Sequence, residues 1–376
     1  MRQLHRRISP RPARDRDRAQ TGNIGCSRAD SPHRCDAAAQ PCRTGRAANS
    51  DGDDGLNTSR FLALAMLILM QSGCMSFTPQ SSSDSYPTPA QVVRFRTAGT
   101  LVPSADRTRL EPGEALTISG RLRLPSGSGP FPAIVLAHGC AGVTRTEVGW
   151  EESLHDWGYA TFVLDSFEGR GLSEVCTQPW NLSGYERIPD AYGALRALLD
   201  DERIDPTRIV LMGFSHGGIL AMGAATAWAH RTFSRAPGEG FRAFIGFYPF
   251  CGVIFPELEE MTAPIRIHIG EMDDWTPSEP CLQWTQSLVE SGHDASTTVY
   301  PRAQHSFDSI GTSLRVLPDV VNAAACRVRL PSLLGPYPPL EEVAGCLRKG
   351  ATIGWSNKAT EQARQNVRRE LSELLR

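Results

Sequence analysis

The chain has 376 residues, of which 40% are hydrophobic and 21% charged, and its formal net charge is −2. This length allows one large domain or two small ones with a sizeable core. After residue 60 acidic residues outnumber basic ones, which argues against a nucleic-acid-binding surface in the main body.

The first part of the chain has the pattern of an export signal. Residues 1–60 lack apolar periodicity and are rich in Arg, Asp, Ala and Ser, as disordered segments are. FLALAMLILM follows Arg60, and its ten residues are too few to span a bilayer. Together with the small residues before Cys74, this run predicts a signal peptide at residues 61–74. We expect translation to begin close to Arg60; the alternative is a buried helix of a larger domain.

The signal is followed by a segment that suits a tether. QSGC, which ends at Cys74, is similar to the lipoprotein signal box in which the cysteine is lipidated, although Gln71 stands where an aliphatic residue is usual. Residues 75–90 are rich in Ser and Pro and are predicted to be a flexible linker. We therefore expect an exported protein of the cell envelope, either tethered to a membrane through Cys74 or freely secreted.

From residue 91 onward the hydrophobic pattern predicts alternating strands and helices. VVRFRT and LTISGRLRL alternate apolar and polar residues, as antiparallel strands do. Continuous apolar runs follow, as in strands covered on both faces: FPAIVLAHG, YATFVLDSF, RIVLMGF, FRAFIGFYPF and PIRIHIGEM. Helical stretches lie around residues 147–157, 188–201, 217–230 and 277–291. This order predicts an α/β fold with a mostly parallel central sheet and helices on both faces.

The rhythm changes near the C-terminus. Residues 309–355 are rich in Pro, Gly and Leu, so we expect an irregular extension packed on the domain of residues 91–308. The stretch NKATEQARQNVRRELSELLR predicts an amphipathic helix that closes this 309–376 part. A disulfide between Cys326 and Cys346 would hold the extension. No CxxC pair or His-rich cluster indicates a metal site, and we expect no metal and no organic cofactor.

GFSHGG at residues 213–218 joins a predicted strand to a predicted helix. In a G-x-S-x-G elbow the serine sits on a sharp turn at the C-terminal edge of the sheet, with small residues such as Gly213 and Gly217 beside it. A serine hydroxyl becomes nucleophilic only when a base takes its proton and an acid orients that base. Without such partners for Ser215, the motif would fit a tight turn with a buried serine.

Both partners follow in the chain order Ser, acid, His that α/β-hydrolases use. GEMDDWTP places Asp273 and Asp274 just after one strand, and YPRAQHSFD places His305 just after the next. Taken alone, the acidic pair fits a turn or a helix cap, and the histidine fits a solvated side chain. Taken together, they predict a triad of Ser215, His305 and one of the two acids.

HGCAG follows the first buried strand and has the place of an oxyanion loop. We expect the backbone N–H groups of Cys140 and His216 to bind an oxyanion. The side chain of His216 should point away from Ser215. His138 is expected to shape the loop without transferring a proton.

Six motifs in order resemble the dienelactone hydrolase family of α/β-hydrolases over residues 116–308: HGCAG, LDSFEGRG, GFSHGG, FYPFCG, GEMDDWTP and YPRAQHSFD. The resemblance implies an α/β-hydrolase fold and cleavage of esters or lactones through a nucleophile–Asp–His triad. Ser215 stands where well-known members use cysteine, and Gly139 where they carry a glutamate that engages the resting cysteine. Both departures point to a conventional serine esterase. The family's G-x-x-D spacing assigns the acid to Asp273, with Asp274 as the alternative.

The resemblance also implies neighbours of the site. Arg170 in FEGRG is a candidate for binding an anionic group of the substrate, the alternative being a structural salt bridge. Trp275 is expected either to line the pocket or to pack. Six cysteines allow fifteen connectivities, and on this fold three pairs are expected to form disulfides: Cys140–Cys176, Cys251–Cys281 and Cys326–Cys346.

These residues predict a serine hydrolase that cleaves an ester or lactone of a small molecule through an acyl-enzyme. Two alternatives stay open: a peptidase or thioesterase on the same fold, and a catalytically silent, envelope-tethered binding protein. A complete triad argues against the silent protein, because binding does not require all three residues. Substrate choice depends on the shape of the pocket, to which residues 309–355 are expected to contribute.

Overall fold

The computed structural model describes residues 89–103, 110–332 and 344–376, all of which belong to one unit, residues 78–376. The leader, the predicted signal peptide with Cys74 and most of the predicted linker lie outside the described residues. Within the described ranges, no helix is long and apolar enough to cross a membrane.

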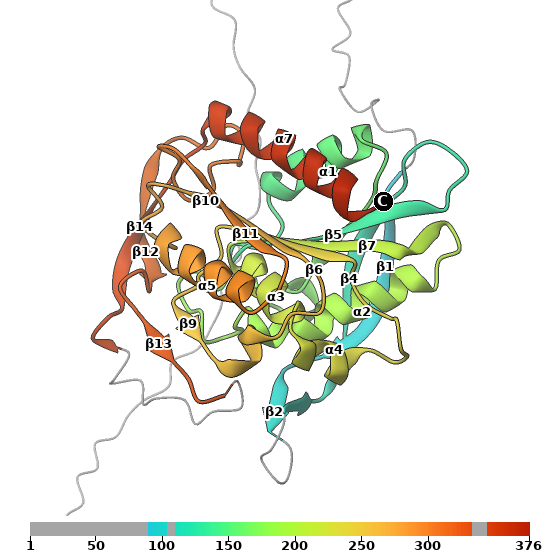
Figure 1. The fold of residues 1–376 in the computed structure, drawn as a ribbon, viewed down its shortest axis with the longest axis horizontal. Coiled ribbons are helices and arrows are strands. Elements are labelled where there is room, and N and C mark those ends of the chain that lie inside the picture. Colours follow the sequence, from blue (N-terminus) through green and yellow to red (C-terminus); the bar gives the residue numbers. More distant parts are fainter. Residues whose placement is uncertain (1–88, 104–109, 333–343) are drawn as a thin grey trace, which may run out of the picture. The chain divides into compact units, whose positions relative to one another are not determined.

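An eight-stranded sheet lies at the centre of the described unit (Figure 1). In spatial order its strands are β1 (Gln91–Ala98), β4 (Ala115–Arg123), β6 (Ala160–Asp165), β5 (Phe131–Ala137), β7 (Ile204–Phe214), β8 (Ala243–Phe247), β10 (Ile265–Gly270) and β11 (Ala295–Tyr300). β4 is antiparallel to both of its neighbours, and the pairs from β6 to β11 are parallel. All five continuous apolar runs became strands of the parallel part, where their side chains form the core.

Helices cover both faces of this sheet (Figure 1). On one face lie α1 (Arg145–Asp156) and α7 (Asn357–Leu374); on the other lie α2 (Ile188–Leu199), α3 (His216–Ala224), α4 (Ala227–Phe233) and α5 (Ser278–Glu290). The arrangement confirms the predicted fold class. The helix expected at 217–230 is divided in two, because the hydroxyl of Thr226 caps the N-terminus of α4 by accepting from the amide of Ala229.

The C-terminal helix packs as its sequence pattern predicts. Buried side chains recur every four residues along α7, at Ala359, Ala363, Val367 and Leu371. Two arginines on the same helix, Arg364 and Arg368, lie over the rings of Trp150 and Trp157 near α1. These contacts join the two helices that cover one face of the sheet.

Short elements complete the described residues. They are the strands β2 (Leu101–Pro103), β3 (Leu110–Pro112), β9 (Val253–Ile254), β12 (Arg315–Asn322), β13 (Val328–Arg329) and β14 (Arg348–Ile353), and the 3-10 helices η1 (Glu168–Arg170), η2 (Tyr185–Arg187) and η3 (Pro256–Glu259).

The extension is more regular than its composition predicts. β12 pairs antiparallel with β14, and β13 pairs parallel with β9 of the main domain. The β12–β14 register shifts between Leu317 and Val321, a stretch that contains Pro318, which has no N–H to donate to a ladder. Ile353 of β14 also bridges to His305, so the extension lies against the loops at the carboxyl edge of the sheet.

Three disulfides form, and they are the three expected pairs: Cys140–Cys176, Cys251–Cys281 and Cys326–Cys346. The first links the loop after β5 to the loop that follows η1. The second joins the loop after β8 to the first turn of α5, and the third closes the extension. Disulfides persist in oxidising compartments, so these pairs indicate an extracellular or periplasmic protein.

Candidate active site

Ser215 lies on a strained turn between β7 and α3. Its backbone has φ 52° and ψ −109°, in the left-handed half of conformational space that residues with side chains rarely adopt. A Cβ atom added to Gly213 would collide with the carbonyl of Gly217, and one added to Gly217 would collide with the carbonyl of Ala137. The turn therefore requires glycine at both positions, as the elbow motif predicts.

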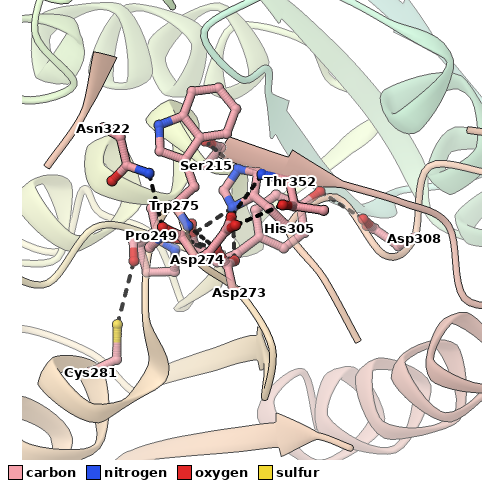
Figure 2. A network of polar contacts seen from close by, with 12 residues as sticks. Ser215, Pro249, Asp273, Asp274, Trp275, Cys281, His305, Asp308, Asn322 and Thr352 are labelled. Carbon is pink, nitrogen blue, oxygen red and sulfur yellow. Dashed lines mark hydrogen bonds and ion pairs between the residues drawn. The ribbon is translucent and has the colours of Figure 1, made fainter. Parts of the chain in front are cut away.

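Ser215, His305 and Asp273 form a continuous chain of hydrogen bonds (Figure 2). The Nε2 atom of His305 lies 3.0 Å from Ser215 Oγ, and its Nδ1 atom lies 2.8 Å from Asp273 Oδ2. Both residues are buried: 1% of the surface of His305 and 4% of that of Asp273 is exposed to solvent. The three residues come from the ends of β7, β10 and β11, as the sequence order predicts.

The carboxylate of Asp273 is fixed by its own loop. Its Oδ1 atom accepts from the amides of Trp275 and Thr276, at 3.0 and 2.8 Å. The hydroxyl of Thr276 lies 3.0 Å from Oδ2 and 3.1 Å from Nδ1 of His305. Sequence reasoning missed Thr276, although a threonine three residues after an aspartate is a recurrent local hydrogen-bonding pattern.

Asp274 has a different set of partners. Its carboxylate accepts from the amide and from the hydroxyl of Thr352, each at 2.7 Å, and its carbonyl accepts from Asn322. These partners belong to β12 and β14, and Figure 2 shows them beside Asp274. Of the two acids, the structure brings Asp273 to His305 and uses Asp274 to hold the extension.

The predicted oxyanion amides lie beside the nucleophile. A Cβ atom added to Gly139 would be 3.7 Å from Cβ of Ser215, so the loop that carries Cys140 lies against the serine turn. His216 is the first residue of α3, where backbone N–H groups have no partner within the helix. Neither the Cys140 amide nor the His216 amide donates a hydrogen bond to a described residue. Both are therefore available to a ligand.

A pocket of about 420 Å³ opens in front of Ser215. Its walls come from the oxyanion loop, the first turn of α1, the triad loops and the extension. The lining includes Leu317 and Ile353 of the extension, so residues 309–355 contribute to the shape of the pocket as predicted. Trp275 also lines it: its ring centroid is 4.8 Å from that of His305, and its Nε1 donates to the carbonyl of Val321.

Tyr248 also packs against the ring of His305 and was not predicted. Its ring centroid lies 4.5 Å from that of His305, and its hydroxyl donates to Asp308 at 2.6 Å. Trp150 donates to the other oxygen of Asp308. The only sequence signal was the aromatic run after β8, because Asp308 lies sixty residues later.

Arg170 does not reach the substrate pocket, which corrects one expectation. All five of its N–H groups are used: both Nη atoms bind the carboxylate of Asp190, at 2.9 and 3.0 Å, and the remaining bonds go to the carbonyls of Ala98, Gly99 and Ser166. Its side chain is 6% exposed, and that of Asp190 is fully buried. Arg170 therefore forms the structural salt bridge that was the alternative.

We expect Arg170→Met to lower the free energy of unfolding by about 3–5 kcal/mol, because it leaves the Asp190 carboxylate buried without its cation. Urea denaturation at neutral pH measures this loss. Arg145, exposed at the rim of the pocket, provides the control, and Arg145→Met should change stability by no more than about 0.5 kcal/mol. A rise in KM for Arg170→Met with unchanged stability would instead support a role of Arg170 in substrate binding.

Two histidines near the site are neutral. Burial, with the nearby Arg187 guanidinium as the next cause, lowers the pKa of His138 well below its usual value and that of His216 to about 3. The His216 ring donates to the carbonyl of Leu182 and points away from the triad, as expected. Neither ring forms a hydrogen bond with Ser215, whose hydroxyl is 3.0 Å from Nε2 of His305.

Glu147 is a buried acid at the pocket wall. It lies in the first turn of α1, where its Oε2 atom accepts from the amide and hydroxyl of Thr144 at 2.6 and 2.9 Å. Burial raises its pKa to about 7 despite these bonds, and the neighbouring carboxyl of Asp308 adds to the shift. The folded state therefore binds a proton on the Glu147 carboxylate more tightly than the unfolded chain does.

The stabilisation linked to this proton is complete below pH 4.5 and is lost as the pH rises to about 7. Glu147→Gln removes the titration and keeps a side-chain acceptor for Thr144. Relative to the wild type, we expect its free energy of unfolding to rise by about 3 kcal/mol between pH 4.5 and 7.5. Chemical denaturation across this pH range tests the prediction. If the free energies of unfolding of the two proteins ran parallel as the pH changed, the prediction would be wrong.

The sequence model of the dienelactone hydrolase family matches residues 118–330, more than half of the chain. The chain belongs to the dienelactone hydrolase family. Membership confirms the family predicted from the six motifs, together with its α/β-hydrolase fold. It also places β7, β10 and β11, whose ends carry Ser215, Asp273 and His305, inside the matched segment.

Curated relatives of this family member are distant. The acylamino-acid-releasing enzyme of Rattus norvegicus is 20% identical over 220 residues, which cover 50% of this chain and 30% of that enzyme. A probable 2-oxo-3-(5-oxofuran-2-ylidene)propanoate lactonase of Bradyrhizobium sp is 21% identical over 202 residues, covering 50% of this chain and 77% of the lactonase. Esterase EstD of Thermotoga maritima is 31% identical over 108 residues, 27% of this chain and 26% of the esterase. The chain thus spans under a third of the releasing enzyme.

Two solved structures are similar to this chain. The structure named m3DLH has a TM-score of 0.51 and 15% identity, and the match covers 77% of this chain and 99% of that chain. The dienelactone hydrolase-like promiscuous phosphotriesterase P91 from metagenomic libraries has a TM-score of 0.49 and 16% identity, covering 77% and 100%. At such identity the first likeness supports the fold alone.

Proposed function

We propose that this member of the dienelactone hydrolase family is a serine hydrolase that cleaves carboxylic esters or lactones of small molecules through an acyl-enzyme. The observation that carries the proposal is the hydrogen-bonded chain from Asp273 through His305 to Ser215 at the base of an open pocket. A binding protein has no need of a serine held on a strained turn and directed at a buried histidine.

In the proposed reaction His305 takes the proton of Ser215 through Nε2 while Oγ attacks the carbonyl carbon. Asp273 keeps Nδ1 protonated and stabilises the imidazolium that forms. The carbonyl electrons move to oxygen, which the amides of Cys140 and His216 bind. His305 then protonates the leaving alkoxide, and a water molecule that it activates releases the acid. These steps require no metal and no organic cofactor.

The three disulfides and the predicted signal at residues 61–74 support a site of action outside the cytoplasm. Whether the chain is tethered there depends on Cys74, and we propose a lipid anchor at this residue. Globomycin, which blocks lipoprotein signal cleavage, tests it: accumulation of precursor supports the anchor, and normal processing contradicts it.

A panel of p-nitrophenyl esters, aryl lactones and the p-nitroanilide of an acetylated amino acid tests the reaction class. We expect hydrolysis of the short esters and labelling by a fluorophosphonate, with the label mapped by mass spectrometry to the peptide that contains Ser215. The anilide is included because the similarity to acylamino-acid-releasing enzymes favours the release of acylamino acids as a second candidate. A folded protein that hydrolyses nothing and takes no label would support the silent binding protein instead.

A further inference from the structure

Arg187, the last residue of η2, links the two backbone segments that carry the oxyanion amides. It is completely buried. Its Nη1 atom donates to the carbonyl of His138 at 2.8 Å and lies 2.9 Å from Nδ1 of His216. One guanidinium group therefore binds both the loop after β5 and the first residue of α3.

The bonds made by the two histidine rings extend this link to the amides themselves. The Nδ1 atom of His138 donates to the carbonyl of Gly139 at 2.7 Å, and its Nε2 atom accepts from the amide of Ser166. That carbonyl belongs to the same peptide group as the Cys140 N–H. His216 donates through Nε2 to Leu182, which leaves Nδ1 as the acceptor for Arg187. A neutral histidine ring therefore fixes the backbone at each of the two amides.

The charge of Arg187 has no direct counterion. No described carboxylate forms an ion pair with it, and its Nε and Nη2 atoms have no hydrogen-bond partner among the described residues. The ring of Phe167 lies 5.5 Å away, and the carboxylate of Asp190 is held by Arg170. The charges of Asp190, Glu147 and Asp165 favour the cationic form of Arg187 without an ion pair. Burial lowers the pKa of Arg187 to about 10, so the group remains cationic at neutral pH.

A buried cation without a direct ion-pair partner is costly in folding free energy. The same cation is favourable once a negative charge develops nearby, because electrostatic interactions are strong where water is excluded. In the proposed reaction this charge appears when Ser215 Oγ bonds to the carbonyl carbon, its proton passes to His305 Nε2, and the carbonyl electrons move to oxygen.

We propose that Arg187 is the positioning residue of the oxyanion hole. Through its contacts with the His138 carbonyl and the His216 ring it holds the Cys140 and His216 segments together, and it places a buried positive charge beside the segments whose amides receive the oxyanion. The inference rests on the proposed function, because it concerns an oxyanion formed at Ser215.

The test compares Arg187→Met and Arg187→Lys with the wild type in the full chain. Turnover of the best ester is measured first, followed by affinity for a trifluoromethyl ketone, which forms an anionic tetrahedral adduct with an active serine. The corresponding secondary alcohol measures ground-state binding in the same pocket. Arg196→Met is the matched control, since Arg196 is a partly buried arginine on α2 that donates to the distant carbonyl of Phe233.

For Arg187→Met we expect kcat to fall by about 10- to 100-fold, somewhat less than on removal of an oxyanion donor itself, with KM within about threefold. Affinity for the trifluoromethyl ketone should fall by the same factor as kcat/KM, and affinity for the alcohol should not change. Arg187→Lys, which retains the charge, should lose less, and Arg196→Met should match the wild type.

Wild-type kcat in Arg187→Met would overturn the proposal, as would equal weakening of ketone and alcohol binding, which indicates a general structural defect. If circular dichroism shows that Arg187→Met does not fold, Arg187→Lys decides: selective loss of ketone affinity supports the proposal, and unchanged ketone affinity overturns it. Absence of wild-type turnover and fluorophosphonate labelling is a different outcome, since it rejects the serine hydrolase function itself.

Discussion

Replacing Ser215 with alanine is expected to lower kcat on the best ester by at least about 10⁴-fold, the largest effect of any single substitution in this chain. The side chain lost carries the hydroxyl that lies 3.0 Å from the Nε2 atom of His305. Without this hydroxyl the proposed acyl-enzyme cannot form, and the amides proposed to bind the oxyanion would stabilise only a slow attack by water. Steady-state kinetics and fluorophosphonate labelling measure the loss, and both signals should disappear together.

A second serine at the pocket wall gives the control. Ser309 lines the same pocket, and its hydroxyl accepts from Thr312 rather than contacting the triad. Ser309→Ala should keep turnover within about threefold of the wild type. Thermal unfolding should be similar for both variants. If Ser215→Ala retained most of the esterase activity, the turn at residues 213–218 would have to be a packing feature and the hydrolysis would have to occur elsewhere.

The main features of the fold were predictable because they depend on local pattern. Continuous apolar runs mark the strands of the parallel sheet, and their carboxyl ends meet at one edge. Ser215 and His305 each follow such a strand, so the sheet brings them together although ninety residues separate them. The disulfide pairs were expected from the fold that the family resemblance implies, on which Cys140 and Cys176 follow neighbouring strands.

The partners of long polar side chains were not predictable. Arg170 does lie at the expected edge of the sheet, but Asp190 of α2 and the carbonyls at the end of β1 draw its side chain away from the pocket. Arg187 gave no signal at all, because a single arginine in a polar segment has no periodicity. Its importance appears only in the structure, where it contacts both His138, in the loop after β5, and His216, the first residue of α3.

The two adjacent acids differ in their partners: Asp273 contacts His305, whereas Asp274 contacts Thr352 of the extension. Asp273→Asn should lower kcat by about 10⁴-fold, since an amide cannot stabilise the imidazolium and favours the wrong tautomer of His305. The fold should be retained, because the asparagine oxygen can still accept from the amides of Trp275 and Thr276.

Asp274→Asn is the matched substitution one residue away. It weakens the bonds to Thr352, which hold β14 beside the pocket, and leaves the hydrogen bond between Asp273 and His305 in place. We expect kcat to stay within about tenfold of the wild type, with the larger change in KM and in thermal stability because the extension is loosened. Rates measured from pH 5 to 9 on both variants decide the assignment. A 10⁴-fold loss in Asp274→Asn with an active Asp273→Asn would exchange the roles of the two acids, and the hydrogen-bonded chain through His305 would no longer describe the working enzyme.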